Sequence, residues 1–292
     1  MESKNKKGVS HIVIVITILV LCVLAATVII TLSSSMKGKK LIETETENVD
    51  GVERSKYIGY FADVDGDGTV DGVIFADLAY SASGEWNCSY DTFSYEAETG
   101  FKNYEIVEES YSVDGAPGYG TKPVLKATGR GKDRFYVMAL SNITQSTDST
   151  KDDNYFTWYD SAFGKISDYS TVTSKNFGTG KTNTETMLKK WNDAHYGTKN
   201  ADTRFLDVWG VIQDKVEDGW FVPSRAEWSA FGNAFGLTDS NCERFRLYDF
   251  LWSSSLNSAR SALGIMFSDG SFYRLRVGQL LLRSLGRDFL IL

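Results

Sequence analysis

Residues 248–277, YDFLWSSSLNSARSALGIMFSDGSFYRLRV, decide the fold class of this 292-residue chain. The first eight residues are aromatic and apolar before they end in a serine run, which predicts a strand. The part from Ala262 to Val277 predicts a β-hairpin that turns at Asp269-Gly270, because this dipeptide suits a type I′ turn. A last strand is expected over residues 280–285. The C-terminal part of the chain therefore predicts an antiparallel sheet.

Helical patterns precede this sheet. In VPSRAEWSAFGNAFG (residues 222–236), Ser224 and Glu227 form a capping box and Gly236 ends the helix. Apolar residues recur in it at helical spacing. In TNTETMLKKWNDAHYG (residues 182–197), the corresponding capping box is Thr182 with Glu185.

A third helix is expected from about Arg204 to Lys215, with one apolar side. Strands are expected earlier in the chain, over residues 56–62, 72–80 and 133–141, which are short aromatic and β-branched runs. Strands, then two or three helices, then an antiparallel sheet make an α+β domain.

The N-terminal part predicts a membrane anchor. Residues 12–32 contain no charge and are long enough to cross a hydrocarbon core of about 30 Å. A cleaved signal peptide is the alternative, although the segment after it lacks an A-x-A-like cleavage site. We expect a cytoplasmic tip and transmembrane helix over residues 1–33, a polar tether over 34–55 and a folded extracellular domain over 56–292. The protein would thus be a single-pass protein of the cell membrane.

The leader KKGVSHIV resembles the processing site of type IV pilin-like proteins, with Gly8, Val9 and Ser10 in the matching positions. That resemblance implies cleavage after Gly8. An ordinary anchor is the alternative.

Charge and composition narrow the function. Residues 1–40 carry +5 of a net charge of −7, so the rest of the chain sums to −12, and nucleic-acid binding is not expected. His195 is the one histidine outside the N-terminal region, so neither a Cys/His zinc site nor a Cys–His nucleophile is expected, and we expect no enzyme. Cys88 and Cys242 could pair outside the cell.

The segment DVDGDGTVDG (residues 63–72) is a candidate calcium loop. Its ligand positions match an oxygen-ligand loop of alternating carboxylates with a glycine at the sharp turn. Strands rather than helices are expected on both sides, so it is not an EF-hand. The alternative is a solvated turn without metal. The expected ligands are Asp63, Asp65, Asp67, Thr69 and Asp71.

The combination of GWFVPSRAEWSAF, FLWSSS and GIMFSDGSFYRLRV resembles the C-type lectin fold. It is most similar to variable proteins diversified by bacterial and phage diversity-generating retroelements, which are related in fold to formylglycine-generating enzymes. The stretches DVDGDGTVDGVIFADLA and FYVMAL also resemble gut-bacterial members. Formylglycine-generating enzymes use paired cysteines near the C-terminus, and no Cys follows Cys242 here. The resemblance therefore implies a shared fold without the enzyme's activity.

The resemblance implies a variable region over residues 252–292. In such a region mutated adenines of Asn codons yield Leu, Arg, Ser or Tyr but never Lys, Glu or Trp. Residues 256–292 contain no Lys, Glu or Trp, but nine Leu and five Arg. An ordinary buried strand pair with an Arg-rich edge is the alternative.

The resemblance also assigns roles to individual residues. The frame residues would be Trp252, Ser253, Ser254, Ala262, Phe267 and Gly270. The ligand-binding residues would be Asn257, Ser258, Arg260, Ser261, Met266, Tyr273, Arg274, Arg276, Gln279, Leu280 and Leu281.

The expected function is recognition of an external ligand by these displayed side chains, and a protein is the favoured class of ligand. A calcium-dependent glycan-binding module is the second reading, and a minor pilin-like subunit is the third.

Overall fold

A computed structural model of the chain describes residues 40–49, 51–86, 91–113, 120–140, 156–158, 173–193, 206–238, 240–242, 250–258, 261–267 and 270–276. The chain divides into two compact units, Met1–Leu41 and Ile42–Leu292. The first unit contains strand β1 (Lys40–Leu41). The elements of the second unit are β2 (Thr46–Val49), β3 (Val52–Ser55), β4 (Phe61–Asp63), β5 (Gly72–Asp77), β6 (Ala82–Trp86), β7 (Asp91–Tyr95), β8 (Asn103–Ser112), β9 (Thr121–Thr128), β10 (Phe135–Ala139), β11 (Phe156–Thr157), α2 (Gly180–Trp191), β12 (Leu206–Asp207), α3 (Val208–Val211), α4 (Gln213–Glu217), α5 (Arg225–Ala234), β13 (Phe250–Ser258), β14 (Ser261–Met266) and β15 (Ser271–Arg276).

The second unit is an α+β domain with mainly antiparallel sheets and few helices, which confirms the predicted class. One sheet has the strand order β8-β9-β4-β5-β10, in which only the β4–β9 pair is parallel. A second sheet has the order β13-β14-β15 and is fully antiparallel. The hairpins β2–β3 and β6–β7 complete the antiparallel part.

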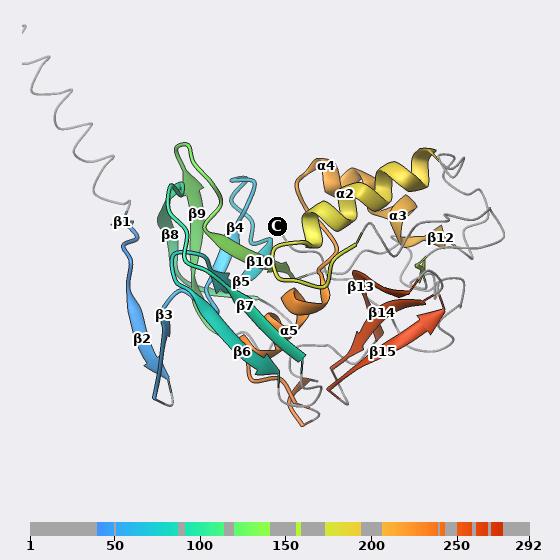
Figure 1. The fold of residues 1–292 in the computed structure, drawn as a ribbon. Helices are drawn as coiled ribbons and strands as arrows, with labels where there is room; N and C mark the ends of the chain where they lie inside the picture. The colour runs from blue at the N-terminus through green and yellow to red at the C-terminus, as the bar shows by residue number, and fades with distance from the viewer. Residues whose placement is uncertain are drawn as a thin grey trace, which may run out of the picture. The chain divides into compact units, whose positions relative to one another are not determined.

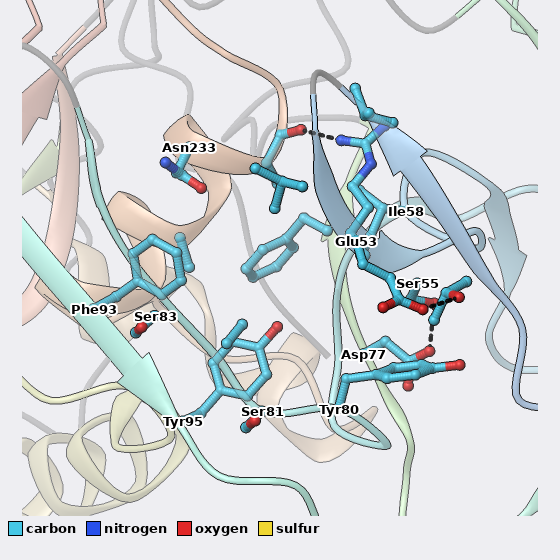
Figure 2. A pocket seen from close by; sticks show the side chains of 18 residues that line it. Glu53, Ser55, Ile58, Asp77, Tyr80, Ser81, Ser83, Phe93, Tyr95 and Asn233 are labelled. Atoms are coloured by element: carbon cyan, nitrogen blue, oxygen red, sulfur yellow. Dashed lines mark hydrogen bonds between the residues drawn. The ribbon is translucent and has the colours of Figure 1, made fainter.

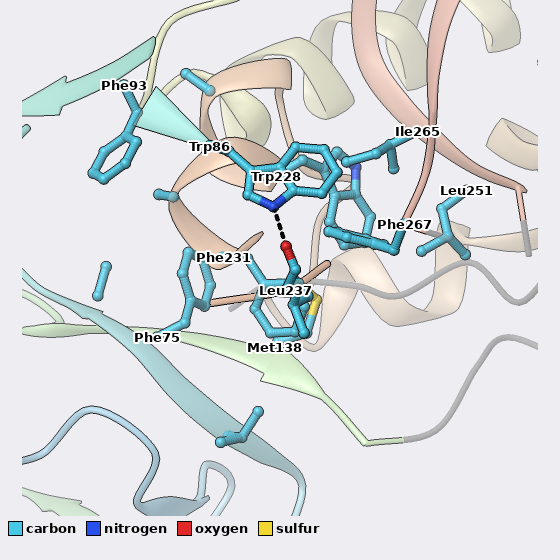
Figure 3. Close-up of a cluster of buried hydrophobic side chains, with 14 of the residues drawn as sticks. Phe75, Trp86, Phe93, Met138, Trp228, Phe231, Leu237, Leu251, Ile265 and Phe267 are labelled. Carbon is cyan, nitrogen blue, oxygen red and sulfur yellow. Dashed lines mark hydrogen bonds between the residues drawn. The ribbon is translucent and has the colours of Figure 1, made fainter. Parts of the chain in front are cut away.

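Helix α5 is the centre of the domain and contacts β5, β6, β7 and β13 (Figure 1). The predicted capping box at its start is confirmed, because Ser224 accepts from the backbone of Glu227 and Glu227 accepts from the backbone of Ser224. Gly236 follows the helix with a φ of +55°, a backbone conformation that glycine adopts without strain. Trp228 and Phe231 are fully buried on the apolar face of α5. These two rings pack with Trp86 and Phe267 in the largest hydrophobic cluster (Figure 3).

Helix α2 begins in a different way from the prediction. It starts at Gly180, so Thr182 lies inside its first turn and the predicted Thr182–Glu185 capping box is wrong. The first N–H group of α2 and an N–H group just before the helix find their acceptor on another helix. Oε1 of Glu227 accepts from the backbone N–H of Gly178 at 3.0 Å and of Gly180 at 3.1 Å. A buried carboxylate on α5 thus replaces the local cap that the sequence offers.

The predicted third helix is divided into the short helices α3 and α4 at Ile212. The interruption is slight, because the Ile212 backbone N–H still donates to the Val208 carbonyl oxygen at 3.1 Å. Val208, Trp209 and Ile212 are buried together in a second cluster with Trp158. The predicted apolar side is therefore confirmed, while the continuous helix is not.

The folded domain begins earlier than predicted. Residues 46–55, which belong to the expected polar tether over 34–55, form the hairpin β2–β3. This hairpin is held to the domain by polar contacts: Ser55 donates to Asp77 at 2.5 Å, and Arg54 donates to the Ala234 carbonyl oxygen at 3.3 Å. The strand expected over residues 56–62 is also shorter, because only its last two residues belong to β4.

The C-terminal hairpin is confirmed as β14–β15, but its loop is longer than a two-residue turn. Met266 pairs with Ser271, so the four residues from Phe267 to Gly270 connect the strands. Phe267 is fully buried, and its ring lies 5.1 Å from that of Trp86. Burial of this ring in the core explains why Phe267 leaves the ladder before the Asp-Gly dipeptide.

Several predictions fall on other parts of the chain. The anchor over residues 12–32, Cys88 and the strand over residues 280–285 lie outside the described residues, and Cys242 is buried. In the part of the chain that the structure describes, no helix is both apolar enough and long enough to cross a bilayer.

Candidate functional site

The predicted frame of the C-terminal site begins with a bulge in β13. Between the pairs Trp252–Gly264 and Leu256–Ala262, three serines of β13 lie opposite one residue of β14. Carbonyl oxygens of this irregular segment accept hydrogen bonds from indoles of other elements. Trp228 Nε1 donates to the Trp252 oxygen at 3.2 Å, and Trp158 Nε1 donates to the Ser253 oxygen at 2.9 Å.

The serine hydroxyls of the bulge connect β13 to both long helices. Ser254 Oγ accepts from the Asn183 amide on α2 at 3.1 Å. Ser255 Oγ accepts from the backbone N–H of Arg225, the first residue of α5, at 3.0 Å, and donates to the Ser174 carbonyl oxygen. Buried hydroxyls need such partners. The serine run therefore links the sheet to both helices through hydrogen bonds.

The predicted frame and ligand-binding residues differ in exposure. All six frame residues are buried. Among the predicted ligand-binding residues whose side chains are described, none is buried: Asn257, Ser261 and Met266 are half-buried, and Ser258, Tyr273 and Arg274 are exposed. Arg276 is described in its backbone only, and Arg260, Gln279, Leu280 and Leu281 lie outside the described residues.

The structure gathers some of these residues and separates others. Ser258 and Ser261 share a hydrogen bond of 2.7 Å, and Asn257 donates to Ser261 at 3.4 Å. Arg276 pairs with Ser261 in the ladder, so it lies at the same end of the sheet. Met266 lies at the other end of β14, five residues away, which is about 17 Å along a strand. The predicted set therefore follows the length of the sheet and does not form one compact patch.

Strand β15 presents its residues to two sides. Successive side chains of a strand point to opposite faces, so Phe272 and Arg274 share one face and Tyr273 lies on the other. Tyr273 pairs with Gly264, which has no side chain to cover the tyrosine ring. Tyr273 is 36% exposed. On the first face, the Phe272 ring lies 5.0 Å from the Arg225 guanidinium.

Sequence reasoning missed a pocket beside this first face. The Lys175 pocket has a volume of about 760 Å³ and is lined by β6, β7, the segment before α2 and the first residues of α5. Its charged lining residues are Glu85, Asp91, Lys175 and Arg225. They come from segments far apart in the chain, so no local pattern could have grouped them.

The predicted calcium loop brings three carboxylates together. Oxygens of Asp63, Asp65 and Asp71 lie within 4.8 Å of one another, so these residues could hold a metal ion. Burial raises the pKa of Asp71, and the charges of Asp65 and Asp63 raise it further, although a hydrogen bond from the Val64 N–H opposes both effects. A cation at this position would relieve the repulsion.

The other two predicted ligands, Asp67 and Thr69, are not part of this group of three carboxylates. Asp67 accepts from both the backbone N–H and the hydroxyl of Thr69, and these bonds lower its pKa. Both bonds go to Oδ1 of Asp67 and lie within its own turn. A cation is already close to the three carboxylates: Lys126 Nζ lies 4.0 Å from Asp63 and donates to the Gly66 oxygen at 2.6 Å.

A second pocket of about 620 Å³, the Tyr80 pocket, lies between the hairpins β2–β3 and β6–β7 and the last turn of α5 (Figure 2). Aromatic side chains of Tyr80, Phe93 and Tyr95 form much of its wall. Asp77 lines it as well, but Arg134 neutralises this carboxylate with two hydrogen bonds of 2.8 Å. Glu53 and Arg54 are the other charged residues of its lining.

Comparisons with protein-family models, with curated proteins and with solved structures found no match to this chain.

Proposed function

We propose that this protein is a membrane-anchored recognition protein of the C-type lectin fold, of the kind diversified by retroelements, and that it binds an external protein without catalysis. The observation that carries the proposal is the contrast in burial over residues 252–276. The residues assigned to the frame are buried, and those assigned to display whose side chains are described are half-buried or exposed. A recognition surface needs this division, because side chains outside the core can vary at little cost in stability.

In this proposal the frame and the displayed side chains have separate tasks. Hydrogen bonds from Trp158, Trp228 and Asn183 hold β13 in place. Tyr273 and Arg274 on β15 are exposed and supply the anchor contacts, since Tyr and Arg are enriched among residues that dominate binding energy.

The test of this proposal is the DNA beside the coding sequence. We expect a reverse transcriptase and a near-copy of the segment that encodes residues 252–292, with differences concentrated at adenines. Sequencing chains from independent isolates should find substitutions at Tyr273 and Arg274 and none at Trp252 or Ala262. Variation spread evenly over buried and exposed positions would reject diversification of this surface.

Calcium-dependent glycan binding is the second candidate, and the Asp63–Asp65–Asp71 group favours it. Carboxylate oxygens are the ligands that Ca²⁺ prefers. Calorimetric titration of the full chain with Ca²⁺ tests the site, with Asp65→Asn as the variant and Asp214→Asn on α4 as the control. Binding to a glycan array that is abolished by a chelator would favour this candidate over protein recognition.

The proposed location is the cell surface, with residues 12–32 as the anchor and the domain outside. Protease treatment of intact cells should remove the domain from this anchor. N-terminal sequencing distinguishes an intact leader from the pilin-like alternative, which predicts a new terminus after Gly8.

A further inference from the structure

The Lys175 pocket joins residues of the constant scaffold to the display strand. It opens between the β6–β7 hairpin and the start of α5, and Phe272 of β15 stacks on the guanidinium of Arg225 in its wall. Arg274 lies two residues further along the same face of β15. A ligand held by β15 would therefore meet this pocket.

The ion pair in the pocket wall is incompletely satisfied. The Arg225 guanidinium contacts one carboxylate oxygen of Asp91, a residue that is 8% exposed. Among the described residues, the second oxygen of Asp91 and the Nε of Arg225 have no hydrogen-bond partner. A buried donor and a buried acceptor without partners cost free energy. A bound group that accepts one bond and donates another would recover that cost.

The charges of the pocket lining are balanced, because Arg225 and Asp91 neutralise each other and Lys175 is opposed by Glu85 on β6. Arg274 on β15 is not part of the lining and adds one positive charge near it. Burial lowers the pKa of Lys175, and the positive charges of Arg225 and Arg274 lower it further, with Asp91 opposing. Lys175 and Arg225 line the same pocket and can therefore act together on one bound anion.

We propose that the Lys175 pocket binds the carboxylate of an acidic side chain on the protein that β15 recognises. This inference rests on the proposed function and adds the chemistry of its partner. With Arg274 beside the balanced lining, one positive charge is in excess, which matches a single carboxylate better than a phosphate dianion. The neighbouring backbone N–H of an acidic residue would donate to Asp91, and the Phe93 and Phe272 rings would cover the methylene groups.

The experiment measures binding of a fluorescent hexaglutamate peptide to the full chain by anisotropy, with hexaglutamine as the peptide control. Lys175→Met is the test variant and Lys181→Met on α2 is the matched control, since both side chains are exposed. We expect Lys175→Met to weaken binding about tenfold, as for the loss of one charge-assisted hydrogen bond, and Lys181→Met to leave it unchanged. Added salt should weaken wild-type binding.

Equal binding by the two variants would overturn the inference, as would binding of hexaglutamine. Displacement of the peptide by inorganic phosphate at lower concentration than by glutarate would also overturn the choice of a carboxylate. Tyr273→Ala keeps the tests separate, because Tyr273 lies on the other face of β15 and should not change peptide binding. Absence of a template repeat would reject the proposed function without changing the peptide result. Equal peptide binding by the two variants would reject the carboxylate site without affecting the search for a template repeat.

Discussion

Substitution of Glu227 tests whether one buried carboxylate on α5 caps the start of both α2 and α5. Its carboxylate accepts hydrogen bonds from the N–H groups of Gly178 and Gly180 through Oε1, and from Ser224 through Oε2 at 2.6 Å. In Glu227→Gln, the amide oxygen can replace Oε1, but the amide nitrogen cannot accept from Ser224. One buried N–H group then loses its partner, which costs about 1–3 kcal/mol.

The pH dependence of stability adds a second, independent signature. Burial raises the pKa of Glu227 to about 7, although the hydrogen bonds from Ser224, Gly180 and Gly178 oppose this. A carboxyl group with a raised native pKa holds its proton more tightly in the folded state. Its stabilising contribution is therefore complete below the unfolded value of about 4.5, and is lost as the pH rises through about 7. The loss amounts to about 3 kcal/mol.

The assay is thermal unfolding of the full chain at several values between pH 5 and pH 8. We expect Glu227→Gln to be less stable than the wild type at pH 5, with the difference narrowing as the pH rises, because the variant has no titrating group there. A domain of this size loses about 2–4 °C of Tm per kcal/mol. Glu185→Gln is the control and should change the Tm little, since the expected cap at Glu185 does not form. Equal stability at pH 5, or a difference that widens toward pH 8, would refute the shared cap.

Two further predictions concern buried contacts, and a third concerns the three-Asp group. Asp77→Asn leaves the buried Arg134 guanidinium without its bidentate carboxylate and should lower the free energy of unfolding by about 3–5 kcal/mol in chemical unfolding. The double variant Asp77→Asn/Arg134→Met should regain part of this stability. Gly232→Ala would place a Cβ 2.7 Å from Trp86 Nε1 and should lower stability by about 1–3 kcal/mol, with a change in tryptophan fluorescence. Lys126→Met removes an ammonium group near the three-Asp group and should raise Ca²⁺ affinity about fivefold in calorimetry; unchanged affinity would exclude competition by that group.

The elements that the sequence predicted well are those whose signals are local. Helix α5 carries its own capping box and its own terminating glycine within 13 residues. The hairpin β14–β15 was likewise recognised from a local signal, the Asp269-Gly270 dipeptide between its strands. The start of α2 was mispredicted because its acceptor, Glu227, is 47 residues away from Gly180. Capping rules compare residues within one turn and cannot include such a contact.

The same distinction explains the candidate sites. Asp63, Asp65 and Asp71 were found because their spacing lies within one loop. Asp67 has the same spacing, but spacing does not show that its Oδ1 already accepts two hydrogen bonds from Thr69. Lys175 was missed because the residues around it come from separate elements, and only folding brings them together.

The indole bonds to β13 have a consequence for how change spreads through the domain. Trp158 and Trp228, which lie outside this sheet, donate hydrogen bonds to the carbonyl oxygens of Ser253 and Trp252. β14 lies between β13 and β15, so β13 does not pair with β15. A substitution at an exposed position of β15 therefore leaves both indole bonds in place. Exposed residues of β15 would then be free to change repeatedly in evolution while the rest of the domain continues to fold.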